Sequence, residues 1–405
     1  MIQETRIGLA RLGKIDPESI SDAISHGAYE GFKKALTLNP EEMLSRYESS
    51  GLRGRGGAGF PTGLKQKFTS QSCSDCQKYV VCNADEGEPG TFKDRTIMEN
   101  DPHLLIEGML IAAYTIGASK GFIYIRGEYN LSIERLRKAI VDASSRGFLG
   151  DNILGNAFSF EMELRLGAGS YLCGEELTLL ESLEGKRGYP RIKPPFPAEK
   201  GLWGNPTLIN NVETFVQLPA ILINGLDWYT ALGTSESKGT KIFTISGRVN
   251  RPGFYEVEMG TTLRQLIEEL AGGMKNGYSF AGALLGGAAG TFVDESLLDT
   301  PMAYETLKAK GATMGSGAII VLDNTTDRID FLQNILEFFK HESCGKCVPC
   351  RIGTTLLCEM SSQLESNPEI LQKMVNEASY MARTSLCPLG QSPILPLKSF
   401  ERYFS

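Results

Sequence analysis

Residues 51–65 read GLRGRGGAGFPTGLK, and this glycine-crowded stretch decides the organisation of the chain. Six of its residues are glycine, and Arg53, Arg55 and Lys65 are interleaved with them. Where Cβ atoms are absent, backbone N–H groups can close around a phosphate, and cationic side chains add further donors. The stretch therefore predicts a phosphate-binding loop, with a glycine loop that binds nothing as the alternative.

The glycines at positions 54, 56 and 59 have the G-x-G-x-x-G spacing of a dinucleotide-binding fingerprint. That fingerprint follows a strand, whereas residues 40–50 begin with proline, carry acids in their first turn and repeat apolar residues at helical spacing. A helix is therefore predicted before the loop, which argues against an ordinary Rossmann fingerprint here.

Composition limits the class of protein. The chain has 405 residues, 41% of them hydrophobic, which is enough for about two to four domains. Its 41 basic and 48 acidic residues give a net charge of −7, which argues against nucleic acid as a partner. Residues 1–6 lack the apolar segment of a signal peptide, and the most apolar run, residues 104–113, is too short to span a bilayer. Nine cysteines without a disulfide-like spacing indicate a reducing compartment, so we expect a cytoplasmic protein.

Apolar runs at residues 78–83 and 120–127 are predicted to be buried strands, and helical patterns follow each of them. This alternation predicts a largely parallel α/β sheet. The first strand runs directly into Asp85, Glu86 and Glu88, so these carboxylates should lie at the carboxyl edge of the sheet, where such proteins bind ligands. They are interpreted as acceptors for ribose or flavin-ring groups, with a solvated turn as the alternative.

Three further segments are expected to face the same ligand. Residues 167–176 place glycines, a tyrosine and two acids just before a helical pattern, and residues 188–197 form a stiff proline-rich loop with cations and a ring. An asparagine pair begins a later helix, where it would either cap that helix or bind flavin ring and ribitol groups. The side chains singled out are Tyr171, Glu175, Glu176, Lys193, Phe196, Asn210 and Asn211.

Three cysteines at two-residue intervals, Cys344, Cys347 and Cys350, are followed 37 residues later by Cys387. This spacing is typical of a [4Fe–4S] cluster, because tight turns bring three thiolates together and a distant one completes the set. Tetrahedral zinc is the alternative, but its cysteines usually come as two separated pairs. A protein that joins a nucleotide-binding site to such a cluster needs a cofactor that accepts two electrons together and releases them one at a time. Flavin is a cofactor of that kind.

The pattern of elements predicts four regions. They are a helical lead-in at residues 1–50, an α/β ligand-binding domain at 51–238, a small α+β domain of β-grasp (SLBB-like) type at 239–325 and a helical cluster-binding domain at 326–405.

Together these motifs closely resemble the NADH-binding flavoprotein subunit of respiratory complex I (NADH:quinone oxidoreductase, F type), over essentially the whole chain. The resemblance rests on residues 53–65, 83–95, 167–176, 210–214 and 342–351. It implies a Rossmann-like FMN-binding domain, then a β-grasp domain and a C-terminal four-helix-type bundle that carries the [4Fe–4S] cluster. It also implies FMN as cofactor and NADH as substrate.

The resemblance assigns roles to individual residues. The implied FMN contacts are Gly54, Arg55, Gly56, Lys65, Asn83, Asp85, Glu86, Tyr171, Gly174, Glu175, Asn210, Asn211 and Thr214. Phe60, Phe68 and Phe196 resemble the rings that sandwich the adenine, and Lys193 is expected near the NADH phosphates. Glu88 is expected to face the nicotinamide and Glu176 to disfavour the additional phosphate of NADPH, so these two carboxylates should lie nearest the chemistry. Cys344, Cys347, Cys350 and Cys387 match the cluster ligands.

Three positions depart from the family pattern. Gln66 stands where the family usually has tryptophan, and Leu177 replaces the usual threonine. Pro388 follows Cys387 in place of the common glycine or alanine. The first two are expected to alter NADH affinity, and the third to shift the loop of the fourth cluster ligand.

The implied activity is that of an NADH dehydrogenase component, which transfers hydride from NADH to FMN and passes single electrons to the cluster. The implied partners are a thioredoxin-like [2Fe–2S] subunit and the peripheral arm of a complex I-type assembly that reduces quinone, located at the cytoplasmic face of the inner membrane. The chain has no additional ferredoxin-like cysteine runs, which favours complex I over the longer relatives in hydrogenases.

Two alternatives stay open. One is the diaphorase subunit of a soluble NAD-linked formate dehydrogenase, hydrogenase or electron-bifurcating complex. The other, from a different class, is a zinc-stabilised nucleotide-binding regulator without redox activity. Metal content distinguishes the second, since the cluster needs four irons and the regulator one zinc.

Overall fold

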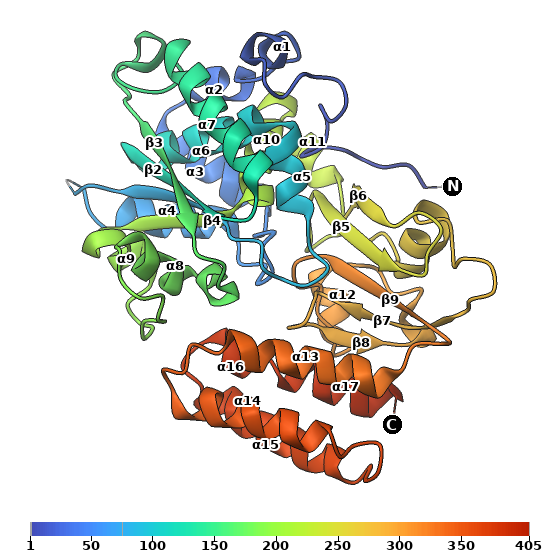
Figure 1. The fold of residues 1–405 in the computed structure, drawn as a ribbon. Coiled ribbons are helices and arrows are strands. Elements are labelled where there is room, and N and C mark those ends of the chain that lie inside the picture. The colour runs from blue at the N-terminus through green and yellow to red at the C-terminus, as the bar shows by residue number, and fades with distance from the viewer. Residues whose placement is uncertain (1, 75, 405) are drawn as a thin grey trace.

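The first half of the chain builds a four-stranded sheet (Figure 1). The computed structural model describes residues 2–74 and 76–404. Its first four strands are β1 (Tyr79–Ala84), β2 (Lys120–Arg126), β3 (Glu161–Gly167) and β4 (Thr207–Asn211). All of their pairings are parallel, in the order β3-β2-β1-β4. The prediction of a parallel α/β sheet is therefore confirmed.

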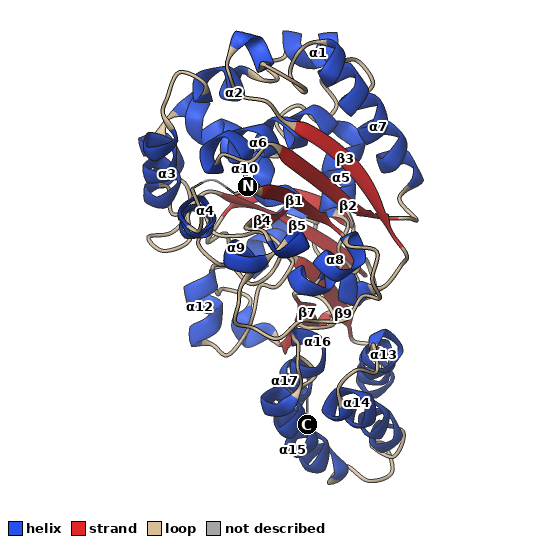
Figure 2. Cartoon of the chain, turned by 90° about the vertical axis from the view of Figure 1, so that its left-hand side faces the viewer, coloured by secondary structure: helices blue, strands red, loops and turns tan. Residues whose placement is uncertain are grey.

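Helices cover both faces of this sheet (Figure 2), which explains why β1 and β2 are continuously apolar. On one face, Val80 and Cys82 join a core shared with α6 (Pro102–Ile116) and α10 (Val212–Asn224). On the other face, Val81 and Phe122 pack with leucines of α8 (Glu176–Leu183). Successive residues of β1 thus point to opposite layers.

The remaining helices of this α/β unit surround the two layers. They are α1 (Ile20–Ser25), α2 (Glu30–Ala35), α3 (Pro40–Ser49), α4 (Thr62–Gln71), α5 (Lys93–Asn100), α7 (Asn130–Ser145), α9 (Pro197–Lys200) and α11 (Leu226–Ala231). The segment expected as a lead-in buries Tyr29, Phe32 and Met43 in the same core as α6 and α10. Arg11 also donates to the buried Asp101 at 2.7 Å. The N-terminal helices are therefore packed against the sheet unit.

A second sheet follows, and it is mixed. It contains β5 (Thr240–Gly247), β6 (Gly253–Glu258), β7 (Phe280–Leu285), β8 (Thr291–Val293) and β9 (Ala318–Asp323), in the order β6-β5-β9-β7-β8. The pairing of β5 with β9 is parallel, and the other pairings are antiparallel. A π-helical turn (Gln265–Leu270) packs into the core of this unit, and α12 (Tyr304–Ala309) precedes β9. We call residues 240–323, from the start of β5 to the end of β9, the second-sheet unit.

The C-terminal part is a helical bundle. It contains α13 (Arg328–Glu342), α14 (Val348–Ser361), α15 (Ile370–Thr384), α16 (Pro388–Gln391) and α17 (Ile394–Phe404). Leu336, Leu357, Met374 and Leu397 form its core, which also takes in Phe292 of β8. Figure 2 shows the bundle projecting from the second sheet, with α16 at the end nearest the α/β unit.

None of the helices within residues 2–74 and 76–404 is long and apolar enough to cross a bilayer.

Candidate functional site

The carboxyl edge of the parallel sheet brings the predicted amide side chains together. Asn83 of β1 and Asn211 of β4 are register partners on neighbouring strands. The side chain of Asn211 accepts the backbone N–H of Glu213 at 3.0 Å and so caps α10, as one interpretation of the asparagine pair predicted. The Nδ2 of Asn210 is buried and has no hydrogen-bond partner among the described residues. The pair thus divides its roles, and Asn210 offers a donor to a ligand.

The glycine loop lies against this edge, and two of its glycines leave room for neighbouring side chains. A Cβ at Gly56 would lie 3.0 Å from the Cβ of Asn211. Gly59 has a φ of +63°, and a Cβ there would lie 2.5 Å from the ring of Tyr304. The loop is closed by the Gly54 N–H, which donates to the carbonyl of Phe60 at 2.8 Å. Glycine is therefore required by both backbone conformation and close packing.

The cations of the loop are used differently. The fully buried Arg55 donates from its guanidinium to the carbonyls of Thr240 at 2.9 Å and Lys238 at 2.6 Å, and its backbone N–H donates to the Thr214 hydroxyl at 2.8 Å. Lys65 donates to the carbonyl of Ile209 at 2.9 Å and remains partly exposed. The guanidinium of Arg55 thus holds the loop in place, whereas Lys65 stays available at its surface.

The acidic loop after β1 contains carboxylates in different environments. The Oδ2 of Asp85 is buried without a partner in the described part of the chain, and burial, with Glu128 and Glu342 nearby, raises the pKa of Asp85 to about 7 against the opposing charge of Arg126. Glu86 accepts the backbone N–H groups of residues 94 and 95 at the start of α5, at 2.8 and 3.0 Å. Burial raises the pKa of Glu86 to about 7 as well. Asp85 therefore presents an unpaired acceptor, while Glu86 is engaged by the fold.

Glu88 links the α/β unit to both other parts of the chain. Its carboxylate accepts the Tyr171 hydroxyl at 2.6 Å and the backbone N–H of Ala289 in the second-sheet unit at 3.2 Å. Tyr171 in turn donates its backbone N–H to Glu342, the last residue of α13, at 3.0 Å. Burial raises the pKa of Glu88 despite these hydrogen bonds. A short chain of contacts therefore runs from the acidic loop to the start of the cysteine segment.

The acids at the start of α8 are paired with two lysines. Glu175 caps this helix by accepting the backbone N–H groups of residues 177 and 178 at 3.0 and 2.9 Å, and it lies 2.9 Å from Lys193. Glu176 lies 2.8 Å from Lys193 and 3.4 Å from Lys65. Burial would raise the pKa of Glu176, but the two lysines outweigh it and hold this pKa below its ordinary value. Glu176 is therefore ionised at neutral pH.

Just upstream of α8, the backbone carbonyl of Gly174 accepts a hydrogen bond from the side-chain amide of Asn83 at 2.7 Å.

The three predicted stacking rings are on the surface. Phe60 is 46% exposed, Phe68 53% and Phe196 52%, which leaves their faces accessible. Phe60 lies two residues before α4, Phe68 lies on it and Phe196 immediately precedes α9, which packs against α4. Exposed large aromatic rings on adjoining elements are typical of a binding surface.

The four predicted cluster ligands gather at one end of the bundle. Cys344 and Cys347 lie between α13 and α14, Cys350 is in the first turn of α14, and Cys387 precedes α16. A Cβ at Gly390 of α16 would lie 2.8 Å from the Cβ of Cys350, so these two helices touch where the thiols are. Cys347 and Cys387 occupy the N-cap positions of α14 and α16.

Among residues 2–74 and 76–404, no group of three His, Cys, Asp or Glu side chains is close enough together to hold a metal ion.

A cavity of about 420 Å³ separates the proline-rich loop from the segment of the fourth cysteine. Its wall includes Lys193 and Glu175 on one side and Cys387 and Pro388 on the other. The predicted nucleotide-phosphate contact and the predicted cluster ligand therefore border one space.

The three departures from the family pattern have different surroundings. Gln66 is fully buried on α4, and neither of its amide atoms has a partner within the described residues. Leu177 is buried with the leucines that pack α8 on the sheet. Pro388 is the first residue of α16, where proline is favoured because its missing N–H would be unpaired anyway. Pro388 is thus compatible with the fourth ligand's position.

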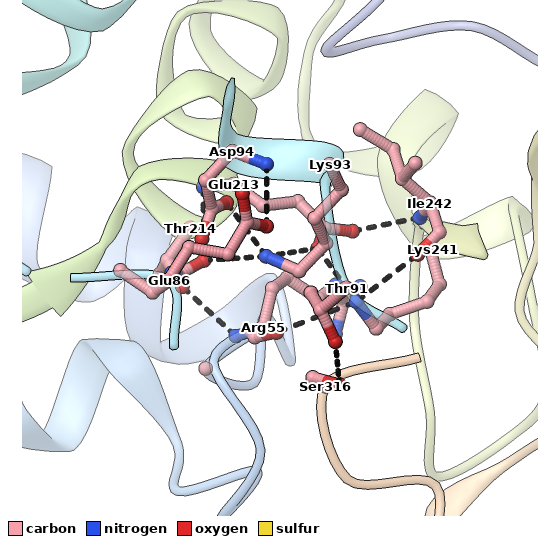
Figure 3. Close-up of polar contacts among 12 residues, drawn as sticks. Arg55, Glu86, Thr91, Lys93, Asp94, Glu213, Thr214, Lys241, Ile242 and Ser316 are labelled. Carbon is pink, nitrogen blue, oxygen red and sulfur yellow. Dashed lines mark hydrogen bonds and ion pairs between the residues drawn. The ribbon is translucent and has the colours of Figure 1, made fainter. Parts of the chain in front are cut away.

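A buried ion cluster behind the site was not predicted (Figure 3). Lys93 donates to Asn211 at 2.9 Å and lies 2.7 Å from Asp94 and 3.0 Å from Glu213. Lys241 of β5 lies 2.6 Å from the same Glu213, and burial lowers the pKa of Lys241 to about 8 against the opposing charge of Glu213. This cluster orients Asn211 and joins the α/β unit to the second-sheet unit.

Sequence signals for this cluster were weak. Lys93 and Glu213 lie within the quoted segments 83–95 and 210–214, but nothing in their spacing shows that they meet. Lys241 is the second residue of β5, and a lysine side chain usually reaches solvent. Tyr304, which packs on the glycine loop, had no signal at all.

Comparison with known proteins places the chain among its relatives. Residues 47–220 match the Nuo51 FMN-binding domain, residues 242–288 the SLBB domain and residues 330–405 the NADH-ubiquinone oxidoreductase-F iron-sulfur binding region. The chain is 46% identical to the NADP-reducing hydrogenase subunit HndC of Solidesulfovibrio fructosivorans, over 98% of this chain and 81% of that protein. It is 43% identical to the F-type subunit of NADH-quinone oxidoreductase from Escherichia coli, over 96% of this chain and 88% of that protein.

A solved structure of an NAD+-reducing [NiFe]-hydrogenase in its H2-reduced state superposes with a TM-score of 0.86 at 35% identity. The match covers 99% of this chain and 65% of the hydrogenase chain. These matches confirm the resemblance drawn from the motifs, and the chain belongs to the family of F-type subunits of NADH-quinone oxidoreductase.

Proposed function

We propose that this chain oxidises NADH by hydride transfer to bound FMN and passes the electrons singly to a [4Fe–4S] cluster. The observation that carries this proposal is the path of contacts through Glu88, Tyr171 and Glu342. It joins the acidic loop at the sheet edge to the helix that ends beside the cluster cysteines, so one chain holds both an electron entry site and an exit.

The residues at the sheet edge fit FMN. Lys65 offers a partly exposed cation beside the glycine loop, which suits the phosphate. Asn210 and Asp85 each carry a buried polar atom without a partner in the part of the chain that the structure describes, as expected of groups that bind a polar ring or ribitol chain. The remaining FMN contacts are those that the resemblance implies. When bound, FMN supplies hydride acceptance and stepwise release of electrons.

The chain's own residues bind and orient NADH. Phe60, Phe68 and Phe196 offer exposed faces for the adenine, and Lys193 offers a cation for the phosphates. Glu88 lies on the nicotinamide side, where it is held by the Tyr171 hydroxyl. A general base is not required, because positioning and electrostatics are what the protein contributes.

Selectivity between nucleotides is assigned to Glu176. The lysines beside it keep its carboxylate ionised, and an ionised carboxylate repels the additional phosphate of NADPH. The same lysines also neutralise part of that repulsion. The selectivity should therefore be moderate, and it should depend on Glu176.

The cluster is assigned to Cys344, Cys347, Cys350 and Cys387, and it supplies one-electron transfer. Two of these thiols are buried in the bundle core, where the charge of a thiolate needs the compensation that iron provides. The electron acceptor is assigned to a thioredoxin-like [2Fe–2S] subunit in the peripheral arm of a complex I-type assembly, at the cytoplasmic face of the inner membrane. The names of the relatives support membership of a multi-subunit enzyme.

We also assign a Rossmann-like FMN domain to residues 51–238, a β-grasp domain to 239–325 and the cluster domain to 326–405. The family matches at residues 47–220, 242–288 and 330–405 support this division.

A second candidate function is the diaphorase component of a soluble hydrogenase or formate dehydrogenase complex. It is favoured by the likeness to two hydrogenase proteins, one named for NADP reduction and one for NAD+ reduction. The two candidates share the same site and differ in the partner that takes the electrons.

The experiment that tests the shared chemistry is cofactor analysis of the purified full chain. About one FMN and four irons per chain support the proposal. One zinc and no flavin would support the nucleotide-binding regulator instead. Isolation of the native assembly, followed by assay of quinone, hydrogen and formate turnover, then separates the two oxidoreductase candidates.

A further inference from the structure

The glycine loop is held in part by residues outside its own domain. The hydroxyl of Tyr304, the first residue of α12, donates to the carbonyl of Gly54 at 2.8 Å. The Arg53 guanidinium lies over the Tyr304 ring at 4.2 Å and donates to the carbonyl of Gly59 at 2.7 Å. The absence of a Cβ at Gly59 makes room for the same ring. Tyr304 therefore contacts the loop near both of its ends.

The peptide unit between Gly54 and Arg55 is fixed on both sides. Its carbonyl accepts the Tyr304 hydroxyl, and its N–H donates to the Thr214 hydroxyl at the start of α10 at 2.8 Å. Because a trans peptide is planar, hydrogen bonds at its two ends define its orientation. The second-sheet unit thus sets one end of a peptide plane in the loop, and α10 sets the other.

Further contacts from the second-sheet unit and the segment leading into it reach Arg55 (Figure 3). Its guanidinium donates to the carbonyls of Lys238 and Thr240, and its own carbonyl accepts Lys241 at 3.3 Å. Arg55 is fully buried, so these contacts are not exchanged with water. The loop is consequently attached to the second-sheet unit at Gly54, Arg55 and Gly59.

We propose that the second-sheet unit pre-organises the cofactor loop, and that Tyr304 is a positioning residue for FMN. A glycine-rich loop has many accessible conformations, and ordering it on binding weakens affinity. A loop already ordered by Tyr304, Arg53 and Arg55 avoids that loss. This inference rests on the proposed function, because it takes FMN as the ligand of the loop.

The test compares Tyr304→Phe with Tyr255→Phe in the full chain. Tyr255 lies in the same second-sheet unit and also donates its hydroxyl to a backbone carbonyl, at 2.6 Å, but that carbonyl belongs to Arg251 of the same unit and not to the loop. Each variant loses one hydroxyl hydrogen bond and keeps its ring. FMN is removed reversibly, and the FMN dissociation constant and the amide exchange of residues 54–60 are measured for both.

We expect Tyr304→Phe to raise the FMN dissociation constant about fivefold, the usual effect of one lost hydrogen bond. Amide exchange in the loop should become faster in the FMN-free chain. Tyr255→Phe should change neither quantity. Arg53→Gln keeps Tyr304 but removes the cation over its ring, and it should also raise the FMN dissociation constant and speed up amide exchange in the loop. If Tyr304→Phe does not fold, the comparison is made with Arg53→Gln.

Two results would overturn the inference. An FMN dissociation constant within twofold of wild type in both loop variants, in a chain that binds FMN, refutes the positioning role and leaves the proposed function intact. Failure of the folded wild-type chain to bind FMN refutes both, and the two failures are told apart by that wild-type measurement.

Discussion

Replacing Glu213 with glutamine removes a carboxylate that two buried lysines share. The carboxylate lies 3.0 Å from Lys93 and 2.6 Å from Lys241, and it accepts the backbone N–H of Ile242 at 2.8 Å. Glu213 and Lys241 are fully buried, and the side chain of Lys93 is 1% exposed. The substitution therefore leaves buried positive charge with fewer partners, while the side chain keeps nearly the same shape.

The magnitude follows from that loss. Breaking a buried ion pair by removing one partner costs about 3–5 kcal/mol. With an unfolding entropy of about 2.1 cal/mol/K per residue, a chain of 405 residues shifts by about 1.2 °C per kcal/mol, so the apparent melting temperature should fall by about 4–6 °C. The control is Glu30→Gln, whose partner Lys33 lies at 2.7 Å with both side chains about half exposed, and which should cost below about 0.5 kcal/mol.

The assay is thermal unfolding followed by far-ultraviolet circular dichroism at neutral pH. Adding Lys241→Met to Glu213→Gln removes the unpaired charge, so the double variant should recover part of the lost stability. A Glu213→Gln melting temperature equal to that of Glu30→Gln would refute the reasoning. So would a double variant whose loss of stability relative to wild type equals the sum of the two single losses.

The same carboxylate gives a pH dependence, and three further substitutions probe the site. Burial would raise the pKa of Glu213, but the two lysines hold this pKa below the ordinary value of 4.5. The stability that the Glu213 carboxylate contributes is therefore present above pH 4.5 and is lost as pH falls through the folded pKa. Melting temperatures measured across the acid range should show wild type losing its advantage over Glu213→Gln. Gly59→Ala places a Cβ on a residue with positive φ and against the Tyr304 ring. It should weaken FMN binding about tenfold or more in a fluorescence titration. Unchanged binding would contradict the packing of Tyr304 on the loop. Cys387→Ser should lose cluster iron in a metal assay, whereas Cys358→Ser should keep it, because Cys358 lies further along α14 and is outside the expected ligand set. Equal iron in both variants would remove Cys387 from the ligand set. Glu176→Gln should raise the NADPH-to-NADH ratio of kcat/KM about tenfold in stopped-flow flavin reduction, since one like charge is removed, and an unchanged ratio would reassign the selectivity.

The first two strands of the parallel sheet were accessible from sequence because they are short, mainly apolar and buried on both faces. Residues 78–83 and 120–127 show this pattern directly, and the structure has strands at Tyr79–Ala84 and Lys120–Arg126. The position of Asp85 at the carboxyl edge follows from the same rule, since it comes one residue after β1. Local sequence was enough for these features.

The contacts between units were not accessible in this way. The Arg55 guanidinium, expected at the cofactor, instead donates to carbonyls of residues 238 and 240, which are distant in sequence. Lys241 and Tyr304 reach the α/β unit only because the second sheet docks beside it. The periodicity of the sequence does not reveal this docking, because Lys241 lies in a strand and Tyr304 at a helix start whose local patterns are ordinary. Composition and spacing therefore located the site's edge but not the residues that hold it.

The measurement that tests the central claim most directly is an anaerobic titration of the purified, FMN-loaded chain with NADH. The visible absorbance of the flavin and of the cluster is followed, and the titration is repeated with NADPH. The account predicts that NADH bleaches the flavin and that NADPH does so less effectively. A folded chain that holds FMN and iron, yet whose flavin NADH leaves oxidised, would contradict the account.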